Sequence, residues 1–458
     1  MNASTPIPPP TAYFSNLSRE HGFEEAIVEG VLPPDLRGTL YRNGPGLMEQ
    51  FGRRYDHLFE GDGAISAVRF EGGRAAAAAR VIESAGLSEE RAAGRHLNSY
   101  AAPWLTRLRR MHRGQLKNTA NTNVVPWQGG LYALMEGAKP TEIDPRTLAT
   151  LGATDLGVIP STFSAHPHRV ESRRTLYNFG VSNGRETTLD LFALPDEGPA
   201  AMIGRIPLQR PVMLHDFAAT DRHLIFFISP LNIVIWRMML ALRPFQDNFR
   251  WEPDAGTEVI VVPIDAPDAA VRFHTAPFLQ FHFAGAYEER GELVVDYVRY
   301  EDSALLWSLG DGRRLSLTDV STRGAGGRLH RARINPATRE LRSEPLWNGD
   351  CEFPGIGPVV DGRYRHIWLQ SELEVDGALR FQITRLDADG AVLQHTLERG
   401  QISSESVLAG GSVLTLVYDS FSARSHLLVL DAETLAFQAR VMLKQAIPLT
   451  FHGSWLPE

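Results

Sequence analysis

The chain has 458 residues and a formal net charge of −8 at pH 7, with 46 Lys and Arg against 54 Asp and Glu. A chain with this balance and a pI near 6.0 lacks the concentrated basic surface that phosphate backbones need, which excludes nucleic acid as a partner. A hydrophobic content of 43% supports a large core, and the single cysteine, Cys351, rules out an internal disulfide and favours a reducing, cytoplasmic location.

The N-terminal stretch "MNASTPIPPPTAYFSN" has a proline run and no basic segment followed by an apolar core. We therefore expect residues 1–20 to form an extended arm and not a secretory signal. No window reaches the roughly 18 consecutive apolar residues that a membrane span needs. Large β architectures run well past ordinary domain length as one unit, so we expect residues 1–458 to form a single domain that is soluble or peripherally attached to a membrane.

Short apolar runs, rich in β-branched and aromatic residues, recur along the whole chain with Gly, Asp or Asn between them. Such dense short runs predict an all-β protein, built as a propeller, a sandwich or a barrel. Three phrases share a hydrophobic–Asp/Asn–x–x–Thr pattern typical of the outer hairpins of propeller blades, which favours the propeller. They are "IDPRTLAT" (143–150), "INPATREL" (334–341) and "LDAETLAF" (430–437). The predicted strands are 38–43, 64–70, 129–136, 175–181, 223–229, 258–264, 292–300, 365–371, 379–387, 412–420 and 426–432.

Two segments break this pattern. Residues 101–113 place Trp104, Leu105 and other apolar side chains on one helical face, with several arginines nearby. Residues 230–245 are nearly all apolar. They predict either a core helix or an interfacial helix that dips into one leaflet while its arginines stay at the headgroups.

Four histidines stand in four separate short contexts: "SAHPHRV", "VMLHDFAAT", "QFHFAGAYEE" and "PLTFHGSW". Roughly 50, 70 and 170 residues separate successive members, which is closer to one ligand per structural repeat than to a local zinc motif. Taken singly, a histidine beside Phe or Leu is more often a packed side chain than a ligand. Taken together, they indicate convergence of His166, His215, His282 and His452 on one metal ion, because neutral imidazole is the commonest protein ligand for iron, copper and zinc. His168, two residues after His166, is not counted among the four ligands.

Through these histidines and the motifs around them, the chain resembles the carotenoid cleavage oxygenase family, which includes apocarotenoid and stilbene oxygenases and a retinoid isomerase. The resemblance covers nearly the whole length, and ordered agreement of many motifs is more specific than any one of them. The motifs are "LPPDLRGTLYRNGPG", "FEGDGAISAVRFEGG", "NTANTNVV", "GGLYALMEGAKP", "AHPH", "LHDFAAT", "HFAGAYEE", "CEFPGIGP" and "FHGSW".

The resemblance implies a seven-bladed β-propeller with a dome of loops and short helices over an axial Fe(II), which the four histidines hold while O2 serves as co-substrate. Metal-bound imidazoles usually donate their free N–H to a carboxylate, which fixes the ring and raises its donor strength. The family has three such glutamates. Here they are similar to Glu136, Glu352 and Glu405.

Several positions depart from the family pattern. The stretch after Glu405 is short, Gly285 stands where Asn is usual, and Ala64 replaces a common Met; none of these removes a ligand. Stilbene-cleaving members carry a lysine just before the first glutamate, where this chain has Met135. An apolar neighbour fits a polyene better than a phenolate.

The resemblance therefore implies a non-haem Fe(II) dioxygenase that cleaves a conjugated C=C bond of a carotenoid or apocarotenoid into two carbonyl products. A hydrophobic polyene dissolves in membrane, so we expect peripheral membrane contact through 230–245 and 101–113. Three alternatives stay open: a stilbene or phenylpropanoid dioxygenase, a non-catalytic apocarotenoid-binding scaffold, and an isomerase. The sequence leaves the cleaved bond, the metal identity and the oligomeric state undetermined.

Overall fold

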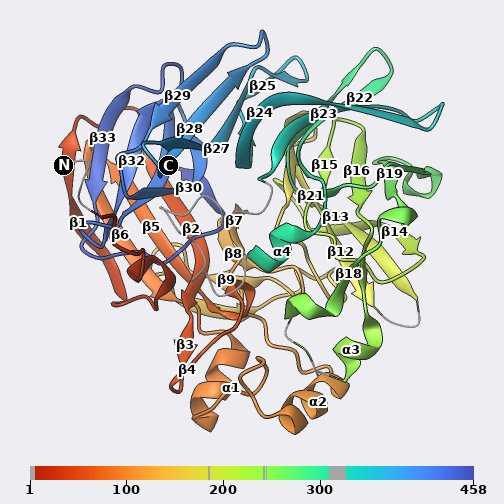
Figure 1. Cartoon of the computed structure of the whole chain (residues 1–458), viewed down its shortest axis with the longest axis horizontal. Helices are drawn as coiled ribbons and strands as arrows, with labels where there is room; N and C mark the ends of the chain where they lie inside the picture. The colour runs from red at the N-terminus through yellow and green to blue at the C-terminus, as the bar shows by residue number, and fades with distance from the viewer. Residues whose placement is uncertain (1–5, 184–185, 241–242, 244, 309–325) are drawn as a thin grey trace.

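Strands dominate the computed structural model, which describes residues 6–183, 186–240, 243, 245–308 and 326–458 (Figure 1). Every run predicted as a strand coincides with one, and the fold is the all-β class that the sequence predicts. Buried Val, Ile, Leu and Phe fill the space between neighbouring sheets, so the core is divided into a series of apolar clusters.

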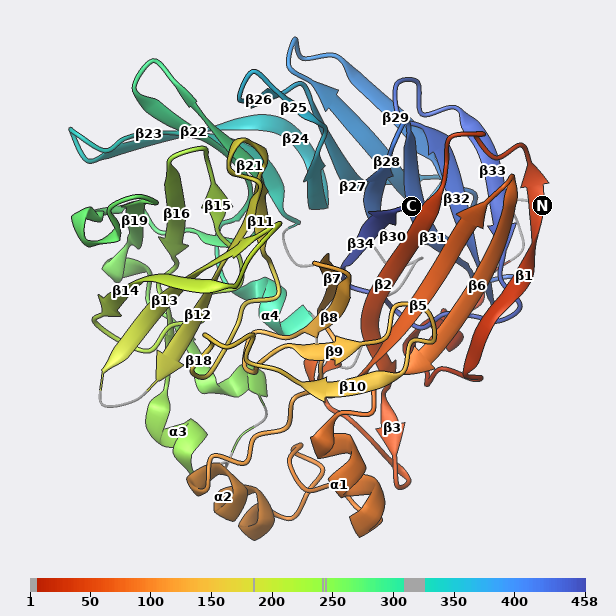
Figure 2. The same ribbon diagram turned by 180° about the vertical axis from the view of Figure 1, so that it is seen from behind.

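The described strands form seven antiparallel groups, which are the blades of a propeller (Figures 1 and 2). In hydrogen-bonded order, the blade that contains strands from both chain ends comprises β34 (Gly453–Pro457), β2 (Gly38–Leu47), β5 (Asp62–Glu71), β6 (Arg74–Val81) and β1 (His21–Gly30). The next three blades comprise β7 (Asn123–Trp127), β8 (Gly130–Leu134), β9 (Thr141–Ile143) and β10 (Thr150–Ala153); β11 (His168–Val170), β12 (Thr175–Asn183), β13 (Thr187–Pro195) and β14 (Ala201–Leu208); and β15 (Ala218–Ala219), β16 (His223–Ile228), β19 (Thr257–Pro263) and β20 (Val271–Thr275). The last three comprise β21 (Leu279–Glu289), β22 (Glu292–Tyr300), β23 (Arg328–Asn335) and β24 (Glu340–Ile356); β24 again with β27 (His366–Val375), β28 (Ala378–Asp387) and β29 (Val392–Thr396); and β30 (Gln401–Ala409), β31 (Ser412–Asp419), β32 (Arg424–Asp431) and β33 (Phe437–Met442). Short two-stranded pairs complete the set: β3 (Glu49–Gln50) with β4 (Arg53–Arg54), β17 (Leu231–Ile233) with β18 (Phe249–Trp251), and β25 (Val359–Val360) with β26 (Arg363–Tyr364).

The ring closes through strands from the two ends of the sequence. β34 pairs antiparallel with β2, from Gly38 opposite Pro457 to Arg42 opposite Gly453. β1 pairs with β6 on one side and β33 on the other, joining the first and last blades into one sheet. This pairing closes the ring, and it places the residues just before β34 at the centre of the ring.

The three phrases that favoured a propeller form outer hairpins, as predicted. In the first, Asp144 Oδ1 accepts the backbone N–H groups of Arg146 (2.8 Å) and Thr147 (2.9 Å) in the turn between β9 and β10. Asn335 and Asp431 accept the corresponding N–H groups between β23 and β24 and between β32 and β33. The shared Asp or Asn is therefore there to satisfy the turn's donors.

The helices are few: α1 (Ala85–Ala93), α2 (Trp104–His112), α3 (Ile235–Met239) and α4 (Ala304–Ser308). The helical prediction for 101–113 is confirmed by α2. The prediction of one helix over 230–245 is wrong for its first part, because Leu231–Ile233 pairs with β18. Among the described residues of this segment, Ile235–Met239 is α-helical and Phe245 begins a 3-10 helix, while residues 241, 242 and 244 lie outside the described residues. α1, α2 and α3 gather at one edge in both views (Figures 1 and 2).

The N-terminal arm is packed against the blades. Its residues 1–5 lie outside the described residues, and the rest contains a single 3-10 turn, Ala12–Phe14. Tyr13 and Phe14 are buried in a cluster with residues of β28, β31 and β32, and Leu449 N–H bonds to Tyr13 O at 2.8 Å. In the described part of the chain, no helix is both long and apolar enough to cross a bilayer.

Candidate metal centre

The four predicted histidines come from four blades, each at or just before the first strand of its group. His166 precedes β11, His215 precedes β15, His282 lies on β21 and His452 precedes β34. Because these strands surround the propeller axis, side chains far apart in sequence project into one central space. The long sequence spacing is therefore the spacing of blades.

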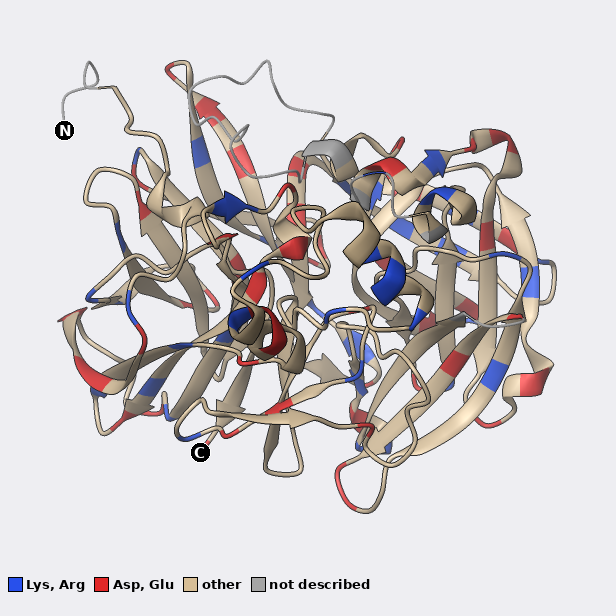
Figure 3. Cartoon of the chain, turned by 90° about the horizontal axis from the view of Figure 1, so that it is seen from below, with Lys and Arg blue, Asp and Glu red and all other residues tan. Residues whose placement is uncertain are grey.

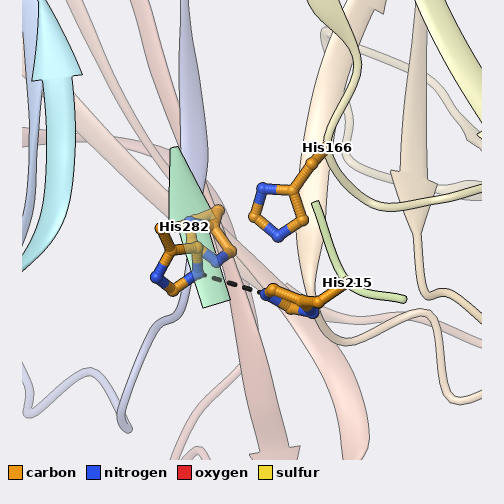
Figure 4. A group of neighbouring side chains, drawn as sticks. His166, His215 and His282 are labelled. Carbon is orange, nitrogen blue, oxygen red and sulfur yellow. Dashed lines mark hydrogen bonds between the residues drawn. The ribbon is translucent and has the colours of Figure 1, made fainter. Parts of the chain in front are cut away.

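The four imidazoles converge. One ring nitrogen from each lies within 4.8 Å of the others, and all four side chains are buried. His215 Nε2 and His282 Nε2 are 3.1 Å apart, and Figure 4 shows the rings of His166, His215 and His282 facing one another. Two nitrogens each about 2.1 Å from one ion lie about 3.0 Å apart when they are adjacent ligands, so this separation suits a shared cation.

In three of the four rings, the nitrogen that faces away from the cluster lies beside a glutamate carboxylate. His215 Nδ1 lies 2.7 Å from Glu136 Oε1, His282 Nδ1 lies 2.5 Å from Glu352 Oε2, and His452 Nδ1 lies 3.0 Å from Glu405 Oε1. When Nδ1–H donates to a carboxylate, the Nε2 lone pair of a neutral ring points inward. Lone pairs that face one another across 3.1 Å repel, and a cation between them turns that repulsion into coordination.

The glutamates are themselves anchored. Glu352 accepts hydrogen bonds from the Tyr300 hydroxyl and from Phe353 N–H (2.8 Å). Burial alone raises the pKa of Glu352, but His282 and the Tyr300 hydrogen bond outweigh it and lower the pKa below its usual range. The carboxylate therefore stays ionised in this buried setting.

Glu405 is held by a cation. Its Oε2 accepts from Arg42 Nη1 at 2.7 Å and from Gly453 N–H at 3.1 Å, while Arg42 Nη2 also donates to Phe451 O at 2.8 Å. Burial raises the pKa of Glu405, yet His452 and Arg42 lower it to about 2. Three carboxylates and one guanidinium leave the centre with an excess of negative charge, which a divalent cation balances.

His166 differs from the other three, because its Nε2 is buried and has no hydrogen-bond partner among the residues that the structure describes. Burial and the neighbouring imidazoles hold the pKa of His166 well below its usual value. A neutral ring with a free lone pair is the protonation state that a metal requires of its ligand. The donor set therefore fits a divalent transition metal.

Asp216 ties three of the histidine-bearing segments together. Its Oδ1 accepts from Phe217 N–H (2.7 Å) and lies 2.7 Å from His168 Nε2, and its Oδ2 accepts from Phe283 N–H (2.8 Å). Asp216 follows His215, and the other two partners neighbour His166 and His282. His168 therefore bonds to Asp216 and does not belong to the four-histidine cluster. Through its bonds to the three segments, Asp216 sets the spacing between the ligands.

Two cavities meet at the cluster. The first, named the dome cavity, has a volume of about 390 Å³; its wall includes His215, Glu136 and Met135 together with residues of 98–122 and 212–249. The second, named the axial cavity, has a volume of about 820 Å³ and is lined by His166, His282, His452, Glu405 and residues of β7, β11, β21 and β34. Each of the four histidines therefore lines one of the two cavities.

The structure also explains two departures from the family pattern. The stretch after Glu405 is a tight hairpin, in which β30 ends at Ala409 and β31 begins at Ser412. A Cβ on Gly285 would meet Ile356 and Tyr364 side-chain atoms at 3.0 Å, so this position leaves little room for the usual Asn.

Arg42, Tyr300 and Asp216 were missed by the sequence analysis. Arg42 carries a readable signal, because it is the only charged residue in "GTLYRNGPGL", all of which is buried. A lone arginine in such a strand needs a buried partner. Tyr300 and Asp216 carry no comparable signal, since their partners lie 52 and 67 residues away.

Comparison with known proteins gives a consistent result. The family model of RPE65, the retinal pigment epithelial membrane protein, matches residues 14–457. The apocarotenoid-15,15'-oxygenase of Synechocystis sp. is 30% identical, covering 93% of this chain and 92% of that protein. A solved structure of cobalt-substituted Synechocystis ACO is 28% identical with a TM-score of 0.88, covering 99% of this chain and all of that one. Resveratrol cleavage oxygenase 1 of Chaetomium globosum is 30% identical over 64% of this chain and 51% of its own length.

Proposed function

Because this chain belongs to the RPE65 family of carotenoid cleavage oxygenases, we propose that it is an Fe(II)-dependent dioxygenase that cleaves a conjugated C=C bond of a carotenoid or apocarotenoid. Both atoms of O2 enter the products, so that one double bond is replaced by two carbonyl groups. The observation that carries the proposal is the four-imidazole cluster, with carboxylates on three of its rings, at the inner end of the dome cavity. His166, His215, His282 and His452 would be the iron ligands.

Ferrous iron supplies the one-electron chemistry that lets triplet O2 react with a closed-shell alkene, which no side chain can do. The protein's own residues do the rest. Four neutral ligands add no anionic charge to the ion, and Glu136, Glu352 and Glu405 fix the orientation of three rings. No general base is needed, since the overall reaction moves no proton.

The dome cavity suits a polyene. His215, Glu136 and Thr122 lie in its wall, while much of the remaining lining is apolar and comes from Met135, Val181, Val212–Leu214, Ile233, Met238 and Phe249. An apolar passage that ends beside the cluster would hold one double bond near the reactive centre and keep water away from it.

We propose that the protein takes its substrate from a bilayer through α2 and α3. Trp104, Leu105, Ile235 and Trp236 are 43%, 55%, 46% and 59% exposed, and Trp104 Nε1–H donates to Leu240 O at 2.8 Å, which joins the two segments. Ile233 and Met238, in the same segment as α3, also line the dome cavity. Exposed aromatic and aliphatic side chains beside arginines are the composition of an interfacial patch.

Membrane contact is tested by vesicle flotation. The variant carrying Ile235→Glu and Trp236→Glu should lose vesicle binding, whereas Leu373→Glu, an equally exposed leucine on β27, should keep it. If the double variant still floats with the vesicles, the proposed membrane contact is refuted.

Activity is tested by loading the purified protein with Fe(II) under nitrogen, admitting air, and separating the products from a carotenoid, an apocarotenal and a hydroxystilbene. Iron-dependent aldehydes from a polyene are expected, and they should vanish in His282→Ala. The matched control is His330→Ala, which removes a half-buried imidazole on β23 that bonds to Ser343 Oγ. Bound iron with no turnover of any substrate would favour a non-catalytic apocarotenoid-binding scaffold.

The second candidate is cleavage of a phenolic stilbene by the same centre. The similarity to a resveratrol cleavage oxygenase favours it. Met135, which lines the dome cavity and bears no charge, speaks against it. Products from the hydroxystilbene alone would select this candidate.

A further inference from the structure

His166 is held differently from the other three histidines. Glu136, Glu352 and Glu405 bond to the rings of the other three, and His166 Nε2 has no hydrogen-bond partner in the described part of the chain. Metal sites need their donor atoms within about 0.5 Å of the required geometry. A ligand that no carboxylate orients must therefore be positioned in another way.

Two buried asparagines hold the backbone that leads to His166. Ser164 and Ala165 are buried and lie between β10 and β11, in no strand. Asn178 Nδ2–H donates to Ser164 O at 2.8 Å, and Asn123 Nδ2–H donates to Ala165 O at 2.7 Å. Buried carbonyl groups need donors, and here side-chain amides supply what strand pairing supplies elsewhere. Two successive carbonyl groups just before the ligand are fixed in this way.

The two asparagines are themselves fixed. Asn178 lies on β12, between β11 and β13. Asn123 begins β7, and its backbone O accepts from Asn43 Nδ2–H at 2.7 Å. Asn43 also donates its backbone N–H to His452 O at 2.9 Å. Asn123 therefore has a fixed position relative to the segment that carries another of the four ligands.

Ser164 joins the same backbone to a further ligand. Its Oγ accepts from His166 N–H at 3.2 Å and donates to His215 O at 3.0 Å. The position of His166 relative to its neighbours thus depends on residues 164–166, which the two asparagines hold.

We propose that Asn123 and Asn178 are positioning residues for His166, because they fix its backbone and thereby the place of its imidazole in the cluster. Asn123 belongs to the motif "NTANTNVV", and an amide at this position supplies a donor that a carboxylate or an aliphatic side chain lacks. The proposal rests on the metal centre of the proposed function and adds two residues to it. The described lining of the dome cavity includes neither asparagine, so they act on the metal ligand and not on the polyene.

Cobalt titration of the metal-free protein measures the effect without turnover. Asn123→Leu and Asn178→Leu keep the side-chain volume but remove the donor, and each should weaken cobalt binding by about 10-fold. Unchanged affinity in both variants would overturn the proposal. Asn123→Ala and Asn178→Ala, which add no branched bulk, take their place if the leucine variants do not fold.

The matched control is Gln445→Met. Gln445 and Asn123 are both 9% exposed, and Gln445 Nε2–H donates to a backbone carbonyl of the N-terminal arm, Arg19 O, at 2.8 Å. This variant also loses an amide that bonds to a buried backbone, so it should lower stability and leave cobalt affinity unchanged. An equal loss of affinity in the control would refute a specific role of the asparagines.

A double-mutant cycle shows whether the asparagines act through His166. In a His166→Ala background there is no fourth ring to position, so adding Asn123→Leu or Asn178→Leu should cause little further loss of cobalt affinity. A further loss as large as in the unaltered protein would mean that the asparagines support the fold in general, and it would refute the assignment.

The visible absorption of bound cobalt gives a reading that stability alone does not move. Its bands depend on ligand geometry, so they should change in Asn123→Leu and Asn178→Leu and stay unchanged in Gln445→Met; identical bands in all three would contradict the proposal. These readouts are independent of catalysis. The expected cobalt changes in a protein that cleaves no polyene would refute the proposed function and leave the positioning role intact. Cleavage by the unaltered protein with unchanged cobalt binding in both asparagine variants would do the reverse.

Discussion

Replacing Arg42 by methionine tests whether the charge network behind His452 stabilises the centre. The guanidinium is 2% exposed and donates to Glu405 Oε2 (2.7 Å) and to Phe451 O (2.8 Å). Arg42→Met keeps the aliphatic bulk but leaves Glu405 without its counter-ion. Breaking a buried pair from one side costs about 3–5 kcal/mol. Glu405 keeps donors from His452 and Gly453, so we expect the lower end, about 3 kcal/mol.

The lowered pKa of Glu405, to which His452 contributes more than Arg42, sets an upper limit on this loss. A carboxyl group whose pKa falls from 4.5 to about 2 contributes about 3 kcal/mol at neutral pH. Because the folded-state pKa is the lower one, this contribution is present above about pH 4.5 and is lost as pH falls toward 2. Stability of the unaltered protein should therefore fall steeply across that window, and Arg42→Met should flatten this dependence.

The assay is urea unfolding of the metal-free protein, followed by tryptophan fluorescence, in a double-mutant cycle with Glu405→Gln. If the two side chains act as a pair, the double variant should lose about 1–2 kcal/mol less than the sum of the single losses. Additivity within about 0.5 kcal/mol would refute the coupling. Cobalt affinity, measured by titration, should also fall in Arg42→Met, because His452 loses a fixed partner on Nδ1.

Three further predictions follow from the same geometry. Asp216→Asn should weaken cobalt binding by about 10- to 100-fold, since it places an amide N–H against a backbone N–H or against His168. Asp296→Asn, a buried carboxylate that pairs with Arg331 and Tyr364, should lower stability without changing the affinity. Lys117→Met removes a cation buried between two carboxylates and should cost about 3–5 kcal/mol in urea unfolding with cobalt affinity unchanged. Met135→Lys should raise kcat/KM for a hydroxystilbene relative to a polyene; an unchanged ratio would show that this position does not select substrates.

The strands and the four clustered histidines could be predicted from local sequence patterns. Short runs rich in β-branched and aromatic residues and bounded by turn residues are local signals, and they locate β2, β22 and β31, which are buried almost throughout. The histidines could be picked out because each stands in its own short motif. The outer hairpins were equally readable, since an Asp or Asn satisfies the turn's donors from within the same few residues.

How these parts meet could not be predicted in this way, because it depends on contacts between residues far apart in the sequence. Pairing of Arg42 with Glu405 spans 363 residues, and nothing local to either side chain encodes it. The segment 230–245 reads as one apolar helix, yet pairing of Leu231–Ile233 with β18 converts its start into a strand, because backbone bonds to a partner outweigh helix propensity. Whether a polar group is satisfied is a property of its surroundings, and the closure of the propeller creates those surroundings.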